Sequence, residues 1–164
     1  MNTESDVFQV ADLHDEFGGQ ICRADFQFRS FGLKTRFFGP VYTVKVNDDS
    51  GLVKTMLAQE GAQRVLVVDN NGSANCAMMG EIMARLAIEN NWSGLLIHGY
   101  IRDSAPIGQL PIGVKSMGTC PVKPNALGAG DTSVSLSFAG VNIHPGDWIY
   151  SDEDGILVSD RQLV

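Results

Sequence analysis

The sequence has few cysteines, and their spacing suits neither metal binding nor a disulfide framework. Cys22, Cys76 and Cys120 are the three cysteines among 164 residues, and no C-x-x-C pair occurs. An odd number of widely separated cysteines fits neither a disulfide-stabilised secreted fold nor a structural zinc site. The simplest setting is a reducing compartment, so we expect a cytoplasmic protein.

Long hydrophobic runs are also missing. The apolar stretches, such as VLVV at 65–68, are far shorter than the roughly 20 residues that span a bilayer. The stretch MNTESDVFQVADLHDEF at 1–17 is acidic and interrupted by charges, unlike a secretory signal. We therefore expect no membrane association. With 44% hydrophobic residues, a chain of this length predicts a single domain over 1–164 with a substantial core.

Positive charge is scarce, with 12 Lys and Arg against 19 Asp and Glu and a formal net charge of -7. This balance argues against direct nucleic-acid binding, which needs clustered cations to contact phosphates. A small anionic substrate would need local cations or a metal to offset the global charge. Nucleotide-binding loops of the G-x-G-x-x-G or G-x-x-x-x-G-K-[ST] kind are absent. The glycine-rich segment LGAGDTS at 127–133 leads into an expected strand, so we interpret it as a structural turn.

Hydrophobic spacing predicts both helices and strands. Helical periodicity is expected at 5–17, 52–61 and 78–90, and strands are expected at 39–46, 64–69 and 94–99. From residue 112 onward the sequence has short strands and tight turns, with HPGD at 144–147 and DEDG at 152–155 as turn signals. The pattern is that of an α+β domain with a β-rich C-terminal portion, and it lacks a regular alternation of strand and helix.

The start of the third expected helix is one candidate site. It reads Met79-Gly80-Glu81-Ile82-Met83. A helix start offers unpaired backbone N–H groups and a partial positive charge, which suit a carboxylate or phosphate. Gly80 would allow close approach of a ligand to the backbone. The alternative is that Gly80 ends a loop and Glu81 favours the helix dipole.

Arg102 and Asp103 form the second candidate, just after the strand expected at 94–99. Ligands of open α/β sheets bind where strands end beside helix starts. Arginine provides a permanently charged planar fork for a carboxylate, and aspartate provides oxygen ligands for Mg²⁺ or Mn²⁺. The alternative is a surface ion pair or a turn aspartate, and spacing alone does not decide between them.

Several segments together resemble one known family. They include FGG at 17–19, GLVKTMLAQEGAQRVLVVD at 51–69, VLVVDNNGS followed by Glu81, then twenty intervening residues and the pair Arg102-Asp103, and GDWIYSDEDGILVS near the end. The sequence resembles the family named for the regulator of ribonuclease E activity A, which also contains class II 4-hydroxy-4-methyl-2-oxoglutarate aldolases. The resemblance implies a layered β/β/α, swivelling-type fold and a homotrimer.

The resemblance also implies an activity and roles for residues. Gly80, Glu81, Ile82 and Met83 would bind the carboxylate and keto group of a 2-oxo acid, Arg102 would hold the same substrate, and Asp103 would bind the metal, largely through water. Glu81 and Arg102 are then the expected catalytic residues. The implied reaction is metal-dependent cleavage of 4-hydroxy-4-methyl-2-oxoglutarate to pyruvate, with oxaloacetate decarboxylation as a side activity, and the metal would be Mg²⁺ or Mn²⁺.

This sequence departs from the aldolase pattern in some places. Aldolase members most often carry Asp where this chain has Glu81, and many have an acidic residue soon after the Arg-Asp pair, where this chain has Ser104-Ala105-Pro106. The segment ARLAIENNWSGLLIHG at 84–99 resembles the ribonuclease-regulating branch of the family more than the aldolases. The alternative function is a protein inhibitor that docks on ribonuclease E. An older methyltransferase interpretation of such proteins finds no nucleotide-type glycine loop here.

Overall fold

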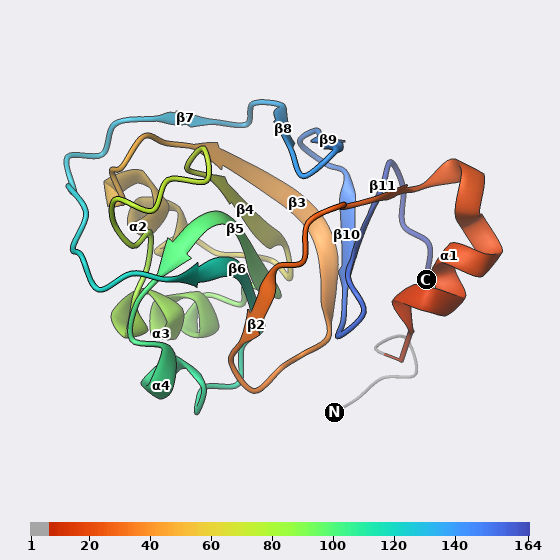
Figure 1. The fold of residues 1–164 in the computed structure, drawn as a ribbon, viewed down its shortest axis with the longest axis horizontal. Coiled ribbons are helices and arrows are strands. Elements are labelled where there is room, and N and C mark those ends of the chain that lie inside the picture. Colours follow the sequence, from red (N-terminus) through yellow and green to blue (C-terminus); the bar gives the residue numbers. More distant parts are fainter. Residues whose placement is uncertain (1–6) are drawn as a thin grey trace.

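A mixed β-sheet forms the centre of the molecule (Figure 1). The computed structural model describes residues 7–164. Within them, the sheet has the strand order β1-β11-β10-β3-β4-β5-β6-β2, with β7 paired to β3, and β8 and β9 form a separate hairpin. Strands β3, β4, β5 and β6 run parallel to one another, whereas β10, β11, β1, β2 and β7 join antiparallel. The strands are β1 (Cys22–Arg23), β2 (Arg29–Phe31), β3 (Phe37–Lys45), β4 (Val65–Asp69), β5 (Gly94–Ile101), β6 (Val114–Thr119), β7 (Asp131–Thr132), β8 (Leu136–Phe138), β9 (Val141–Ile143), β10 (Trp148–Ser151) and β11 (Ile156–Ser159).

Helices and the β8–β9 hairpin cover opposite faces of this sheet. The helices are α1 (Val10–Phe17), η2 (Gly18–Gln20), α2 (Gly51–Leu57), α3 (Glu81–Glu89) and α4 (Ser104–Ile107). Along β4, Leu66 and Val68 point into a core shared with α2, α3 and α4, whereas Val65 and Val67 pack with residues of the hairpin. Because side chains alternate along a strand, a strand covered on both faces must be apolar throughout. The layered α+β prediction is confirmed.

A third, smaller hydrophobic cluster packs α1 against the antiparallel end of the sheet. Phe8, Val10 and Leu13 pack against Tyr150 and Leu157. The Asp152 carboxylate accepts a hydrogen bond of 2.8 Å from the Val10 backbone N–H at the start of the helix. No helix in the described part of the chain is long and apolar enough to cross a membrane.

Each strand expected between residues 39 and 99 occurs, but the helices are shorter than the hydrophobic pattern suggested. α1 begins at Val10, and residues 5–6 of the expected helix lie outside the described residues. α2 ends at Leu57 rather than at Gly61. A Cβ on Gly61 would lie 2.6 Å from Trp92 and 2.7 Å from its backbone nitrogen, so this glycine serves close packing beyond the helix.

The third expected helix begins three residues later than predicted, with Gly80 as its N-cap. Only part of its apolar face is buried. Ala84 and Ala87 are buried and Met83 and Leu86 pack beside them, but Ile82 is 75% exposed. Ile82, in the first turn of α3, lines an open cavity rather than the core.

Candidate functional site

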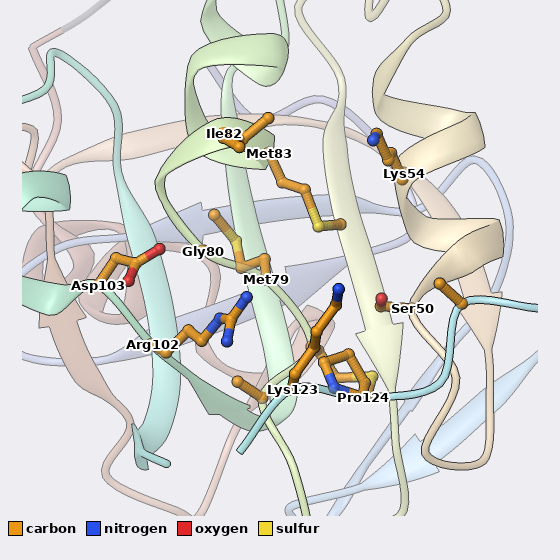
Figure 2. A pocket seen from close by; sticks show the side chains of 13 residues that line it. Ser50, Lys54, Met79, Gly80, Ile82, Met83, Arg102, Asp103, Lys123 and Pro124 are labelled. Atoms are coloured by element: carbon orange, nitrogen blue, oxygen red, sulfur yellow. The ribbon is translucent and has the colours of Figure 1, made fainter. Parts of the chain in front are cut away.

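A cavity of about 310 Å³ opens at the carboxyl ends of the parallel strands (Figure 2). We name it the strand-end cavity. Its lining residues follow β3, β4, β5 and β6 in turn, so four separate connections meet there. They are Ser50, Lys54, Ala77, Met78, Met79, Gly80, Ile82, Met83, Arg102, Asp103, Lys123, Pro124 and Ala126. The carboxyl edge of a parallel sheet is the usual ligand position in such folds.

Arg102 and Asp103, the pair predicted from the sequence to bind substrate and metal, both line this cavity. β5 runs to Ile101, two residues further than expected, so the pair follows the strand directly. The Arg102 backbone N–H donates to the Met79 carbonyl at 3.0 Å, which fixes the strand exit beside the loop that precedes α3. Asp103 adopts a left-handed conformation with φ of 58°, which aspartate tolerates better than most residues. This turn directs its carboxylate toward α3.

The Asp103 carboxylate contacts the first turn of α3. Its Oδ2 accepts a hydrogen bond of 2.9 Å from the Glu81 backbone N–H. A Cβ on Gly80 would lie only 2.4 Å from the same Oδ2. Gly80 has extended backbone angles, so its requirement comes from this close approach of Asp103 and not from a positive φ. The structure thus gives Gly80 a role that the sequence did not suggest, alongside the expected approach of a ligand.

Two further amides at the start of α3 are available to an anion. The first hydrogen bond of the helix runs from Ala84 N–H to the Gly80 carbonyl at 3.1 Å. The backbone N–H groups of Ile82 and Met83 therefore precede the intrahelical ladder and have no acceptor within the helix. Because these N–H groups also carry the partial positive charge of the helix end, they suit a carboxylate.

The Glu81 side chain lies apart from the other predicted residues. Its carboxylate forms an i,i+4 ion pair with Arg85 at 2.9 Å, on the outer face of α3. Of the predicted set, Gly80, Ile82, Met83, Arg102 and Asp103 come together around the cavity, and Glu81 contributes its backbone N–H to Asp103. The catalytic role of its carboxylate stays a prediction.

Sequence reasoning missed two cations in the strand-end cavity, Lys54 and Lys123. Lys54 comes from α2, and Lys123 comes from the loop after β6 (Figure 2). Lys54 lies 48 residues before Arg102 and Lys123 lies 21 residues after it, so no local motif links them. A signal did exist: the family resemblance covers GLVKTML, which contains Lys54, but nothing in the sequence alone indicated that this lysine faces the site.

Asp49 joins the two segments that carry these lysines. Its carboxylate accepts hydrogen bonds from the Gly51 N–H at 2.9 Å and from the Leu127 and Gly128 N–H groups at 3.1 Å. These backbone hydrogen bonds, that from Gly51 first, hold the pKa of Asp49 below its ordinary value. They also account for the LGAGDTS segment, which is a turn leading into β7 as expected.

A second aspartate fixes the loop that leads to Gly80. Asp48 Oδ2 accepts from the Asn75 amide at 3.0 Å, and its backbone N–H donates to Asn70 Oδ1 at 2.7 Å. Burial, aided by this carboxylate, raises the pKa of the neighbouring Cys76 thiol to about 11. The thiol is therefore neutral near pH 7 and is not a nucleophile for the site.

The residues around Asp103 can hold only a particular kind of metal. Among residues 7–164 no three His, Cys, Asp or Glu side chains gather as a metal site. Asp103 offers one carboxylate, of which Oδ2 already binds the Glu81 N–H. Such a site does not fit zinc, which takes several nitrogen or sulfur ligands. It fits Mg²⁺ or Mn²⁺, which keep waters and take oxygens from one carboxylate and a substrate.

Comparison with known proteins identifies the class of this fold and site. The family model described as Aldolase/RraA matches residues 10–158, so the chain belongs to the RraA-like family. A curated relative from Alkalilimnicola ehrlichii, named "Putative 4-hydroxy-4-methyl-2-oxoglutarate aldolase", is 42% identical over 155 residues, covering 94% of this chain and 96% of that protein.

Two solved structures show the same fold. One, from Geobacillus kaustophilus, is described as an S-adenosylmethionine: 2-dimethylmenaquinone methyltransferase; it has a TM-score of 0.93 and 43% identity, covering 95% of this chain and 97% of that one. The other is the RNA-processing inhibitor RraA from Thermus thermophilis, with a TM-score of 0.92 and 35% identity over 96% of both chains. The names carried by these similar proteins thus include an enzyme of carbon–carbon cleavage, a methyltransferase and an RNA-processing inhibitor.

Proposed function

We propose that this protein is a divalent-metal-dependent aldolase that cleaves 4-hydroxy-4-methyl-2-oxoglutarate to pyruvate, with oxaloacetate decarboxylation as a side activity. The observation that carries the proposal is the meeting of Arg102, Asp103 and the start of α3 around one cavity. These groups are a cation, a metal-binding carboxylate and a pair of anion-binding amides. A 2-oxo acid carries the matching groups, a carboxylate beside a keto oxygen.

The residues of the chain bind and orient the substrate. The Arg102 guanidinium has a planar fork that matches the carboxylate next to the keto group. The N–H groups of Ile82 and Met83 add hydrogen bonds at the helix start. Met79 and Met83 provide apolar walls of the cavity for the methyl and methylene groups of the substrate. Together these contacts hold the substrate so that the bond to be cleaved lies next to Arg102 and the start of α3.

Cleavage breaks the bond between C3 and C4, and its electron pair moves toward the keto oxygen to give the enolate of pyruvate. The C4 hydroxyl loses its proton to water and the remaining fragment leaves as a second pyruvate, while the enolate takes up a proton from water at C3 and becomes the first. A divalent metal held by Asp103 would supply Lewis acidity at the keto oxygen. Arg102 and the positive end of α3 stabilise the negative charge that develops there. Oxaloacetate gives the same enolate when it loses carbon dioxide, which explains the proposed side activity.

A direct assay tests this proposal. Purified protein is given 4-hydroxy-4-methyl-2-oxoglutarate or oxaloacetate with Mg²⁺ or Mn²⁺, and pyruvate is measured with lactate dehydrogenase and NADH. We expect pyruvate release that stops on addition of a chelator and returns with excess metal. Lack of turnover of both substrates with both metals would refute the enzyme assignment.

The second candidate function is inhibition of a ribonuclease E-type enzyme. It is supported by the 35% identity to the RNA-processing inhibitor RraA over 96% of both chains. The net charge of -7 favours docking on basic segments of a partner protein and disfavours contact with RNA itself. The test is inhibition of RNA cleavage by purified ribonuclease E in the presence of this protein; the two functions are not exclusive.

A further inference from the structure

The strand-end cavity has more positive charge than a single 2-oxo carboxylate needs. Arg102, Lys54 and Lys123 all line it, and Asp103 is the one carboxylate among its lining residues. None of the three cations forms an ion pair with a described residue. This concentration occurs in a protein whose formal net charge is -7. Three cations around one small cavity repel each other, a single carboxylate offsets this only in part, and an anion of higher charge relieves the rest of the repulsion.

The three cations come from different sides of the cavity. Figure 2 shows Lys54 on α2, across the cavity from Arg102 and Asp103 at the exit of β5, with Lys123 rising between them beside Ser50. Arg102 and Asp103 together serve the 2-oxo end of a substrate. The ammonium groups of Lys54 and Lys123 are therefore left for the opposite end of a molecule that extends across the cavity.

We propose that Lys54 and Lys123 form a subsite for a second carboxylate, and that they select 2-oxo acids with a distal carboxylate over monocarboxylic ones. This inference rests on the proposed function for the position of the 2-oxo end. The cavity volume of about 310 Å³ suits a small molecule of this kind. Met83, Pro124 and Ala126 add apolar lining to the same cavity, which fits the carbon chain of the ligand.

The arrangement is held by a shared anchor. Asp49 binds the N–H of Gly51 at the start of α2 and the N–H groups of Leu127 and Gly128 in the loop after Lys123. The Ser50 N–H also donates to the Asn125 carbonyl at 2.8 Å. The α2 helix and the loop are thus fixed to each other, so that the segments carrying both lysines keep a constant relation to the cavity.

Lys54 also lies in the last turn of α2, where a positive charge stabilises the helix end. A purely structural role would give a lower melting temperature on substitution and an equal loss of affinity for every ligand. A carboxylate subsite would give a loss confined to ligands that carry the distal carboxylate. The two roles are therefore separable by a matched pair of ligands.

The experiment compares 2-oxoglutarate with 2-oxopentanoate, which has a methyl group in place of the distal carboxylate. Dissociation constants are measured by calorimetry at fixed Mg²⁺ for the native protein, Lys54→Met, Lys123→Met and the double variant. Because the lysines are solvent-exposed, each should contribute about threefold to the preference, and both together about tenfold. The preference should weaken between low and high salt, as screening predicts. Lys34→Met, an exposed lysine outside the cavity, is the control for the change in net charge.

We expect the double variant to lose the preference while it binds 2-oxopentanoate as the native protein does. Equal affinity of the native protein for both ligands, or an equal loss for both ligands in the variants, would overturn the subsite. Failure of the proposed reaction is distinguishable. A native protein that prefers 2-oxoglutarate through these lysines but releases no pyruvate from any substrate would keep the subsite and refute the aldolase.

Discussion

The carboxylate of Asp103 accepts a hydrogen bond of 2.9 Å from the backbone N–H of Glu81, which joins the exit of β5 to the first turn of α3. The same carboxylate oxygen would be 2.4 Å from a Cβ on Gly80. One side chain thus caps a helix, faces the strand-end cavity and requires a glycine next to it. Substitutions at these positions separate the structural contact from the chemical one.

Arg102 and Asp103 should respond differently to added metal. Asp103→Asn keeps an oxygen that can accept from the Glu81 N–H, so the fold should persist, but it removes the charge that would hold a cation. Metal affinity should fall and excess Mg²⁺ should partly restore pyruvate release. Arg102→Lys keeps the charge and loses the planar fork, so metal should not rescue it. Removal of such a preorganised charge typically lowers the rate about a hundredfold.

The measurement for this pair is a metal titration of pyruvate release. If the two residues were only a surface pair, either change would cost under about 1 kcal/mol of stability and leave activity intact. Equal rescue of both variants, or full activity in either, would contradict the assigned roles.

Gly80→Ala should displace the Asp103 carboxylate, because the added methyl group would overlap its Oδ2. We expect the activity and the apparent affinity for Mg²⁺ to fall by about tenfold or more, while circular dichroism shows a native fold. Gly19→Ala is the matched control, since nothing lies within 4 Å of a Cβ at that position. An active Gly80→Ala protein with native metal affinity would show that the position of Asp103 is not critical.

Glu81→Gln tests the predicted catalytic carboxylate. Because the Glu81 side chain pairs with Arg85 on the outer face of α3, its replacement should change the rate by less than about threefold and the stability by about 0.5 kcal/mol or less. Arg85→Gln breaks the same pair from the other side and should behave alike. A loss of a hundredfold in Glu81→Gln but not in Arg85→Gln would show that this carboxylate turns into the site during catalysis.

Acid should destabilise the protein partly through Asp69. Burial disfavours its ionised form, but hydrogen bonds from His98, at 2.8 Å, and from the Asn71 N–H outweigh this and lower the pKa of Asp69. A carboxyl with a lowered folded pKa contributes stability above its unfolded pKa of about 3.9, and that stability is lost as the pH falls through the folded value. Melting temperatures measured from pH 6 down to pH 2.5 should therefore fall less steeply in Asp69→Asn. An unchanged slope would contradict this linkage.

Association of three chains is the expected state in solution. Ile82, Val122 and Leu127 are exposed hydrophobic residues on segments that border the strand-end cavity. Exposed apolar groups gathered in one region favour a protein contact, and the resemblance seen in the sequence specifies a trimer. Light scattering at micromolar concentration should give a mass near three chains, and Leu127→Glu should shift it toward smaller species. A monomer in the native protein would refute this expectation.

The sequence by itself determined the α+β class, the three strands expected between residues 39 and 99, and the two segments that form the candidate site. The β4 strand could be identified because burial on both faces requires an uninterrupted apolar run, and β3 because its hydrophobic residues alternate. Arg102 and Asp103 could be singled out because they directly follow an expected strand, at the position where such sheets bind ligands, although spacing alone left a surface ion pair open. These signals are local, since each lies within a few neighbouring residues.

The tertiary structure decided the rest. Ile82 is exposed because it lines the open cavity, and Lys54 and Lys123 reach that cavity from segments that no local pattern connects. The pairing of Glu81 with Arg85, and that of Asp103 with the α3 backbone, follows from side-chain directions that only packing fixes. Hydrophobic periodicity reports which face of an element is buried, whereas the meeting of four strand ends depends on the whole sheet.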